Sequence, residues 1–288
     1  MSARWLLLVM FWTVSGWVVP ALVWPVWAQQ NVRVPVEQGG RKVQLAAQLF
    51  KPANAAASNR VPAVAIFHGC GGPGQNTARM AGLLASWGYA ALVLDSFSAR
   101  GLKDVCGRNW PTQVQAEDRA LDIDAALAWL GTQDFVDAKR LAVMGYSYGG
   151  GVALLHALAP GPSPSSSGAR AVVLVYPDCA LADARGSTLT VRQPTLFAMG
   201  ALDDWTPPEQ CRAVIDRVAK GRDLIETRVY EDAHHSFDAL GLPVRYLDGV
   251  GNRSKPGGCC GAHYGAHEPA WKQFVADVQA FLAKALGR

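Results

Sequence analysis

The sequence of 288 residues lacks the motifs by which organic cofactors are commonly recognised. It has no glycine-rich dinucleotide fingerprint, no phosphate-binding P-loop and no haem-attachment motif, so we expect no organic cofactor. It has no internal repeat either, and its length suits one large α/β domain or two small ones.

A strong excess of charge of one sign is also missing. The chain has 27 Lys and Arg residues against 23 Asp and Glu residues, a formal net charge of +4. The basic residues form no stripe along the sequence. This balance does not indicate a nucleic-acid partner, and we expect none.

Charge is nearly absent from residues 1–28, in which Arg4 is the only charged side chain. An apolar run fills positions 5–19, and Val26-Trp27-Ala28 then suits signal peptidase cleavage before Gln29. We therefore predict a signal peptide over residues 1–28. If it were not cleaved, the same segment would anchor the protein in a membrane.

Cysteine is missing from the predicted signal peptide, and all six cysteines lie in residues 29–288, which we predict to be a single domain. An even number of cysteines in an exported protein favours disulfides. We expect the mature protein in the periplasm or outside the cell. Spacing alone leaves the connectivity open, because six cysteines allow 15 pairings. The six are Cys70, Cys106, Cys179, Cys211, Cys259 and Cys260.

Short continuous apolar runs alternate with segments of helical spacing through the body of the chain. This alternation predicts an α/β fold, with a mostly parallel central sheet and helices on both faces. On each side of Gly39-Gly40, apolar and polar residues alternate along the chain. This pattern predicts an N-terminal antiparallel hairpin at a sheet edge. The predicted strands are 32–36, 42–50, 62–67, 90–94, 141–144, 171–175, 195–199 and 224–230, and the predicted helices are 78–87, 114–130, 149–158, 208–218 and 271–286.

The segment Gly145-Tyr146-Ser147-Tyr148-Gly149 stands between a predicted buried strand and a predicted helix. This order is typical of a nucleophile elbow, in which a serine is exposed in a strained turn and flanking glycines let neighbouring backbone pass closely. We predict that Ser147 is a nucleophile. A glycine-rich turn with an ordinary serine is the alternative.

A second glycine-rich loop, His68-Gly69-Cys70-Gly71-Gly72, follows the predicted strand 62–67. Ligands of parallel sheets bind at the carboxyl ends of the strands, where this loop and Ser147 both fall. We predict that the backbone N–H groups of Cys70 and Tyr148 form an oxyanion hole. Such a hole stabilises the charge that develops on a carbonyl oxygen when a nucleophile adds to it.

Two aspartates and two histidines follow the last two predicted strands. Spacing from the flanking glycine and proline favours Asp203 as the acid that orients a histidine, with Asp204 as the alternative. His235 stands directly before Ser236-Phe237, and this position favours it over His234 as the base. The chain order serine, acid, histidine is that of the α/β-hydrolases.

Together these motifs resemble the dienelactone hydrolase family of α/β-hydrolases, from about residue 42 onward. The resemblance implies hydrolysis of a small-molecule carboxylic ester through an acyl-enzyme on Ser147. The enzymes that name the family have a cysteine nucleophile and a glutamate in the early loop, where this chain has Ser147 and His68-Gly69. The resemblance therefore predicts ester hydrolysis more strongly than it predicts any particular ester, and it leaves a lactone substrate open. The matching segments are 68–72, 95–97, 145–150, 200–207 and 233–237.

The topology implied by the resemblance places Cys70 near Cys106, and Cys179 near Cys211. We predict disulfides at both pairs.

Other functions stay open at this point. A peptidase or an acyltransferase would use the same triad. The segment 259–267, with two cysteines and two histidines, suggests a rival interpretation as a non-catalytic metal-binding or redox protein. Adjacent cysteines rarely share one metal ion, so we predict no metal site and interpret the segment as a stapled surface loop.

Overall fold

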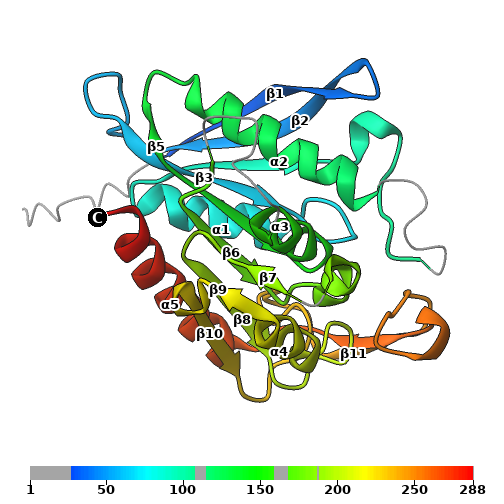
Figure 1. Ribbon diagram of the computed structural model, residues 1–288. Coiled ribbons are helices and arrows are strands. Elements are labelled where there is room, and N and C mark those ends of the chain that lie inside the picture. The colour runs from blue at the N-terminus through cyan, green and yellow to red at the C-terminus, as the bar shows by residue number, and fades with distance from the viewer. Residues whose placement is uncertain (1–26, 108–114, 159–167, 187, 288) are drawn as a thin grey trace, which may run out of the picture.

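A computed structural model of the chain describes residues 27–107, 115–158, 168–186 and 188–287. Its centre is an eight-stranded sheet with the spatial order β1-β2-β4-β3-β5-β6-β8-β10 (Figure 1). Strand β2 runs antiparallel to both of its neighbours, and every other pair is parallel. The strands are β1 (Ala28–Gln38), β2 (Arg41–Lys51), β3 (Val61–Phe67), β4 (Ala90–Asp95), β5 (Val136–Tyr146), β6 (Ala171–Val175), β8 (Thr195–Gly200) and β10 (Ile225–Tyr230).

Helices cover both faces of this sheet (Figure 1). On one face lie α1 (Gln75–Ser86) and α5 (Glu268–Leu286); on the other lie α2 (Ala116–Gly131), α3 (Tyr148–Leu158) and α4 (Pro208–Asp216). The predicted mostly parallel sheet with helices on both faces is confirmed, and so is the N-terminal hairpin. Gly39 and Gly40 both have positive φ, which a tight turn of matching twist requires.

One predicted helix is too long at its end. The segment expected to be helical over 208–218 stops at Asp216, and Val218–Lys220 forms the short strand β9 instead. Backbone pairing with β7 (Leu189–Thr190) is the reason, because the Leu189 N–H donates to the Arg217 carbonyl at 2.9 Å. Tertiary pairing here overrides an apolar spacing that suits a helix.

The remaining short elements lie outside the central sheet. Two of them, β11 and β12, form an antiparallel pair within residues 238–267, which we call the cap loop (orange in Figure 1). The short elements are β11 (Arg245–Leu247), β12 (Ala262–Tyr264) and the 3-10 turns η1 (Ser98–Arg100), η2 (Cys179–Arg185), η3 (Arg222–Leu224) and η4 (Pro256–Gly258).

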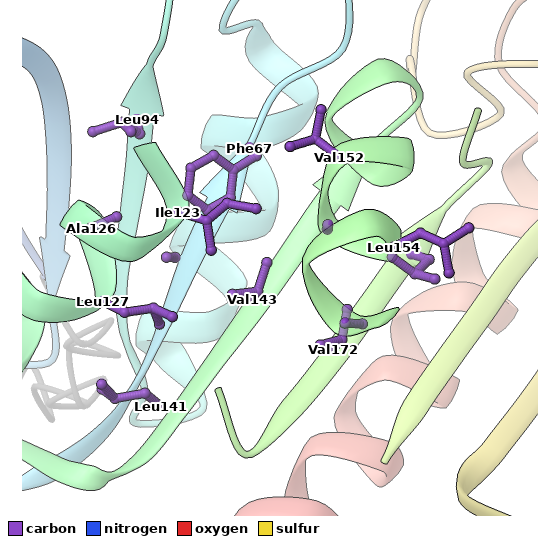
Figure 2. Close-up of a cluster of buried hydrophobic side chains, with 14 of the residues drawn as sticks. Phe67, Leu94, Ile123, Ala126, Leu127, Leu141, Val143, Val152, Leu154 and Val172 are labelled. Atoms are coloured by element: carbon purple, nitrogen blue, oxygen red, sulfur yellow. The ribbon is translucent and has the colours of Figure 1, made fainter. Parts of the chain in front are cut away.

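The core explains why the inner strands have continuous apolar sequences. Strand β3 is buried at all seven positions because helices cover it from both sides. On one side, apolar residues of α2 and α3 pack on β3 and β5, as Figure 2 shows for Ile123, Val143 and Val152. Helix α2 supplies this layer with Ile123, Ala126, Leu127 and Leu130, spaced as one helical face requires.

Two disulfides lie near the carboxyl ends of the parallel strands, and the second of them joins η2 to helix α4. Cys70 pairs with Cys106 at an S–S distance of 2.00 Å, and Cys179 pairs with Cys211 at 2.01 Å. Both predicted pairings are therefore present. Cys259 and Cys260 pair with each other in the cap loop.

The predicted signal peptide lies almost wholly outside the described residues and stays a prediction, as does the single domain over 29–288. Within the described ranges, no helix combines the length and the apolar character that a membrane span needs.

The core makes a first testable prediction. Ile123→Ala removes a fully buried side chain of α2 and should lower the free energy of unfolding by about 2–5 kcal/mol, because it leaves a cavity. Leu121→Ala, on the exposed face of the same helix, should change it by less than about 0.5 kcal/mol. Urea unfolding followed by circular dichroism measures both. Equal losses for the two variants would contradict the assignment of these helix faces.

Candidate active site

The elbow places Ser147 between β5 and α3 with a positive φ of 52°. Such a conformation costs about 1–3 kcal/mol and persists only where the surroundings hold it. The Ser147 N–H donates to the Val175 carbonyl at 2.9 Å, and the Asp178 N–H donates to the Ser147 carbonyl at 3.0 Å. A Cβ at Gly145 would lie 2.3 Å from the Gly149 carbonyl oxygen, so the turn requires glycine there.

Ser147, His235 and Asp203 form one continuous hydrogen-bonded line. The Ser147 Oγ lies 3.0 Å from His235 Nε2, and His235 Nδ1 lies 2.8 Å from Asp203 Oδ2. All three side chains are buried, Asp203 and His235 at 3% and 2% exposure. The structure therefore brings together the three residues favoured by the sequence, in the order that proton transfer from serine to histidine requires.

The two alternative candidates lie elsewhere. Asp204 points to the cap loop, where its carboxylate accepts hydrogen bonds from the His263 N–H at 2.8 Å and from the His263 ring at 2.9 Å. The His234 ring lies 5.4 Å from the His263 ring, and its buried Nδ1 has no partner among the described residues. Neither Asp204 nor His234 contacts the serine.

Thr206 is a member of the site that the sequence analysis missed. Its backbone N–H donates to Asp203 Oδ1 at 2.8 Å, and its hydroxyl lies 2.9 Å from Asp203 Oδ2 and 3.0 Å from His235 Nδ1. The Trp205 N–H adds a further hydrogen bond to Asp203 at 2.9 Å. These donors fix the orientation of the carboxylate. Only its place three residues after Asp203 could have suggested this role.

Two aromatic side chains enclose the His235 ring. Tyr176 and Trp205 have ring centroids 4.6 and 4.8 Å from it. The Tyr176 hydroxyl donates to the buried Asp238 at 2.7 Å. Burial raises the pKa of that carboxyl, so Asp238 favours its neutral form more than an exposed aspartate does. The imidazole is thus held by packing as well as by hydrogen bonds.

The predicted oxyanion loop lies directly against the nucleophile. A Cβ built on Gly69 would lie only 3.2 Å from the Ser147 Cβ. The Cys70 N–H donates to no acceptor among the described residues, and Tyr148 opens α3, where the first N–H groups point away from the helix body. The structure thus places Gly69, the residue before Cys70, against Ser147, and Tyr148 directly follows the serine in the chain. Their role in binding an oxyanion stays a prediction.

A narrow cleft beside Ser147 is lined by residues from several loops. They include Trp205, Thr206, Gly251 of the cap loop, and an ion pair in which Arg253 Nε lies 3.7 Å from Asp178 Oδ2. No local motif predicts this pair, because its members lie 75 positions apart in the sequence. Both charged side chains line the cleft together with Ser147.

The cap loop is bonded to three of the loops that carry the candidate residues. The Trp205 indole N–H donates to the Gly251 carbonyl at 2.8 Å, and the Gly251 N–H donates to the Cys106 carbonyl at 2.9 Å. The Gly265 N–H donates to the His235 carbonyl at 3.0 Å. The cap loop therefore fixes the acid, histidine and disulfide loops relative to one another.

The rival metal-binding interpretation finds no support in the cap loop. Among the described residues, no group of three or more His, Cys, Asp or Glu side chains is arranged to hold a metal ion. Cys259 and Cys260 contact each other, and His263 bonds to Asp204. The absence of a metal site stays a prediction, and the Cys259–Cys260 bond joins adjacent residues and so closes no loop.

Two fully buried polar side chains lie behind the oxyanion loop, and the sequence analysis gave a role to neither. His68 is buried at the end of β3, and burial together with the nearby Arg119 charge lowers its pKa to about 3. The Arg119 guanidinium donates to the His68 carbonyl at 2.8 Å. It packs on the faces of Phe97 and Tyr148, with ring centroids 5.4 and 4.9 Å away.

The chain is similar to known proteins over most of its length. The model of the dienelactone hydrolase family matches residues 45–282. A Bradyrhizobium protein named "probable 2-oxo-3-(5-oxofuran-2-ylidene)propanoate lactonase" is 28% identical over 188 residues, which cover 62% of this chain and 75% of that protein.

Solved structures share the fold at lower identity. The dienelactone hydrolase of Anabaena variabilis is 19% identical with a TM-score of 0.61, covering 90% of this chain and 99% of its own. Esterase 2 of Thermogutta terrifontis is 18% identical with a TM-score of 0.62, covering 89% and 95%. A dienelactone hydrolase-like promiscuous phosphotriesterase from metagenomic libraries is 20% identical with a TM-score of 0.62, covering 90% and 100%.

The buried His68 predicts a dependence of stability on pH. Its pKa is about 3 in the folded chain against an ordinary value of 6.5, so between these values the unfolded chain binds a proton that the folded chain does not. This contribution to stability is complete above pH 6.5 and is lost as the pH falls toward 3. When the pH is lowered from 7 to 5, the loss of this contribution should lower the free energy of unfolding by about 2 kcal/mol.

The control is His68→Asn, whose side chain does not titrate. Urea unfolding at pH 7 and at pH 5 measures the free energy of unfolding of both proteins. The wild type should lose about 2 kcal/mol more than the variant. Other titrating groups, including Asp238, are common to both proteins and cancel in the difference. Parallel pH profiles would show that His68 takes up its proton at the ordinary pH.

Proposed function

The chain belongs to the dienelactone hydrolase family, and from this premise we propose that it is a serine hydrolase that cleaves carboxylic esters. The observation that carries the proposal is the line from Asp203 through His235 to Ser147, with distances of 2.8 and 3.0 Å. A serine hydroxyl becomes a strong nucleophile when a neighbouring histidine accepts its proton. The strained turn presents that hydroxyl at the carboxyl end of the sheet, where ligands bind.

In the proposed reaction, Ser147 Oγ attacks the ester carbonyl carbon while His235 Nε2 accepts the hydroxyl proton. Asp203 stabilises the imidazolium that forms, and the N–H groups of Cys70 and Tyr148 donate to the carbonyl oxygen as it becomes negative. The tetrahedral intermediate then expels the alcohol, which takes the proton from His235, and leaves an acyl-enzyme. Water repeats the steps with His235 as its base and releases the acid.

The names of similar proteins support this reaction class. Thermogutta terrifontis esterase 2 has been solved phosphorylated by paraoxon, a reagent that transfers a phosphoryl group to a nucleophile. The Bradyrhizobium relative bears the name of a lactonase, and a lactone is a cyclic ester that the same steps would open. We therefore include small lactones among the proposed substrates.

The central test is the replacement of the proposed nucleophile. Ser147→Ala should lower kcat for p-nitrophenyl acetate by at least about 10⁴-fold and abolish covalent labelling by a fluorophosphonate, because the attacking oxygen is gone. Intact-mass spectrometry of the labelled wild type should show one adduct, located on Ser147. A Ser147→Ala variant with wild-type activity, or a wild type that takes up no label, would sink the proposal.

The neighbouring aspartates supply a matched control within the same experiment. Asp203→Asn should lower kcat by about 10³–10⁴-fold, since the amide cannot stabilise the imidazolium. Asp204→Asn, one residue away, changes a contact to the cap loop and should retain kcat within about tenfold. A larger loss for Asp204→Asn than for Asp203→Asn would reverse the assignment of the acid.

We also propose that the enzyme is exported, to the periplasm or beyond, after removal of residues 1–28. The disulfides Cys70–Cys106 and Cys179–Cys211 support an oxidising compartment, because such bonds form and persist there. Expression of the full chain in a Gram-negative host, followed by intact-mass analysis of the periplasmic fraction, tests this. We expect a chain that begins at Gln29 and carries no free thiol. Full-length protein held in the membrane fraction would instead show that the segment is an uncleaved anchor.

A further inference from the structure

His68 makes two hydrogen bonds of opposite sense from a fully buried position. The Ser96 N–H donates to His68 Nε2 at 3.1 Å, so this nitrogen carries no proton. His68 Nδ1 lies 2.7 Å from the Gly69 carbonyl oxygen, which can only accept, so Nδ1 carries the proton. The partners alone therefore fix a neutral ring in one tautomer.

The Gly69 carbonyl, which accepts the hydrogen bond from His68 Nδ1, belongs to the peptide unit of the predicted oxyanion hole. The Gly69 C=O and the Cys70 N–H lie in one planar peptide group, so a bond that fixes the oxygen also fixes the direction of the N–H. A hydrogen bond accepted by a peptide oxygen also polarises the group and makes its N–H a stronger donor. No described residue accepts from the Cys70 N–H.

Other contacts hold the imidazole and its peptide still. The Arg119 guanidinium donates to the His68 carbonyl at 2.8 Å, and a charged donor makes such a bond stronger. On the far side, the Val105 N–H donates to the Cys70 carbonyl at 2.8 Å, and the Cys70–Cys106 disulfide joins the same two segments. The peptide between Gly69 and Cys70 is thus anchored on both sides.

We propose that His68 is a positioning residue for the oxyanion hole, whose Nδ1–H orients and polarises the Gly69–Cys70 peptide so that its N–H meets the developing oxyanion. This inference rests on the proposed function and extends it to a residue outside the triad. His68 passes no proton in the reaction, since both of its nitrogens are engaged and burial opposes its charged form. Its effect falls on the transition state, where the oxyanion exists, and not on substrate binding.

A pair of substitutions separates the two hydrogen bonds of the ring. The amide of Asn reaches about as far as Nδ1, and that of Gln about as far as Nε2. His68→Asn therefore keeps a donor for the Gly69 carbonyl, whereas His68→Gln keeps only an acceptor for the Ser96 N–H. His156→Gln is the matched control, because His156 pairs with Asp124 at 3.0 Å on α3 and α2.

Steady-state kinetics with p-nitrophenyl acetate and thermal unfolding are measured for all four proteins. His68→Gln should lower kcat by about 10–100-fold with KM within threefold of wild type, because a misdirected donor weakens transition-state binding. His68→Asn should retain kcat within about fivefold, and His156→Gln should match wild type. The inhibition constant of a trifluoromethyl ketone, which forms an oxyanion on the enzyme, should rise with the loss of kcat.

Three results would overturn the inference. They are wild-type kcat in His68→Gln, equal losses in His68→Asn and His68→Gln that follow the loss in Tm, and a change confined to KM. If His68→Gln does not fold, nitrogen NMR of the wild-type imidazole is the deciding measurement, because a neutral ring with its proton on Nε2 cannot donate from Nδ1 to Gly69. A wild type without esterase activity is a different result, which refutes the proposed function itself and this inference with it.

Discussion

The close contact between the start of α3 and the end of β3 is the constraint on which the candidate site depends. A Cβ at Gly149 would lie 2.5 Å from the carbonyl oxygens of both Phe67 and His68, so the first turn of α3 requires glycine at this position. This approach forces the chain through a sharp turn at Ser147 and brings the loop after β3 against the serine. The nucleophile and the proposed oxyanion donor at Cys70 are thus placed by one backbone contact.

The histidine and the acid need a second device, because they arrive on loops that follow strands β10 and β8. The cap loop supplies it by bonding to both loops, through the His235 carbonyl and through Trp205. It also bonds to Cys106, whose disulfide continues to Cys70. A displacement of the cap loop would therefore shift the histidine, the acid and the oxyanion loop together.

The sequence predicts the parts of this site that follow from local pattern. Continuous apolar runs identify the inner strands because helices cover both faces, and the glycine spacing around Ser147 identifies the elbow because the turn itself demands it. The pairing of Asp203 with His235 also agrees with the motif positions. The sequence could not reveal Thr206, the Arg253–Asp178 pair, or the contacts of His68 and Arg119, because each depends on how separate loops meet in space. The early end of α4 also depends on a contact between separate segments, since β7 forms backbone hydrogen bonds with β9.

The buried charges around the serine are distributed as the proposed reaction requires. Before the attack, the negative charge of Asp203 is held by backbone and hydroxyl donors, and the positive charge of Arg119 lies behind the oxyanion loop. Proton transfer then creates an imidazolium next to Asp203 and a negative oxygen on the side of the site where Arg119 donates to the His68 carbonyl. The imidazolium lies next to the opposite charge of Asp203 in surroundings that exclude most water, where such interactions are strongest. A neutral His68 suits this arrangement, because a second cation beside Arg119 would be repelled and a carboxylate would neutralise it. The histidine at this position thus supplies a donor to the peptide without changing the charge of the loop, which an ionised glutamate could not do.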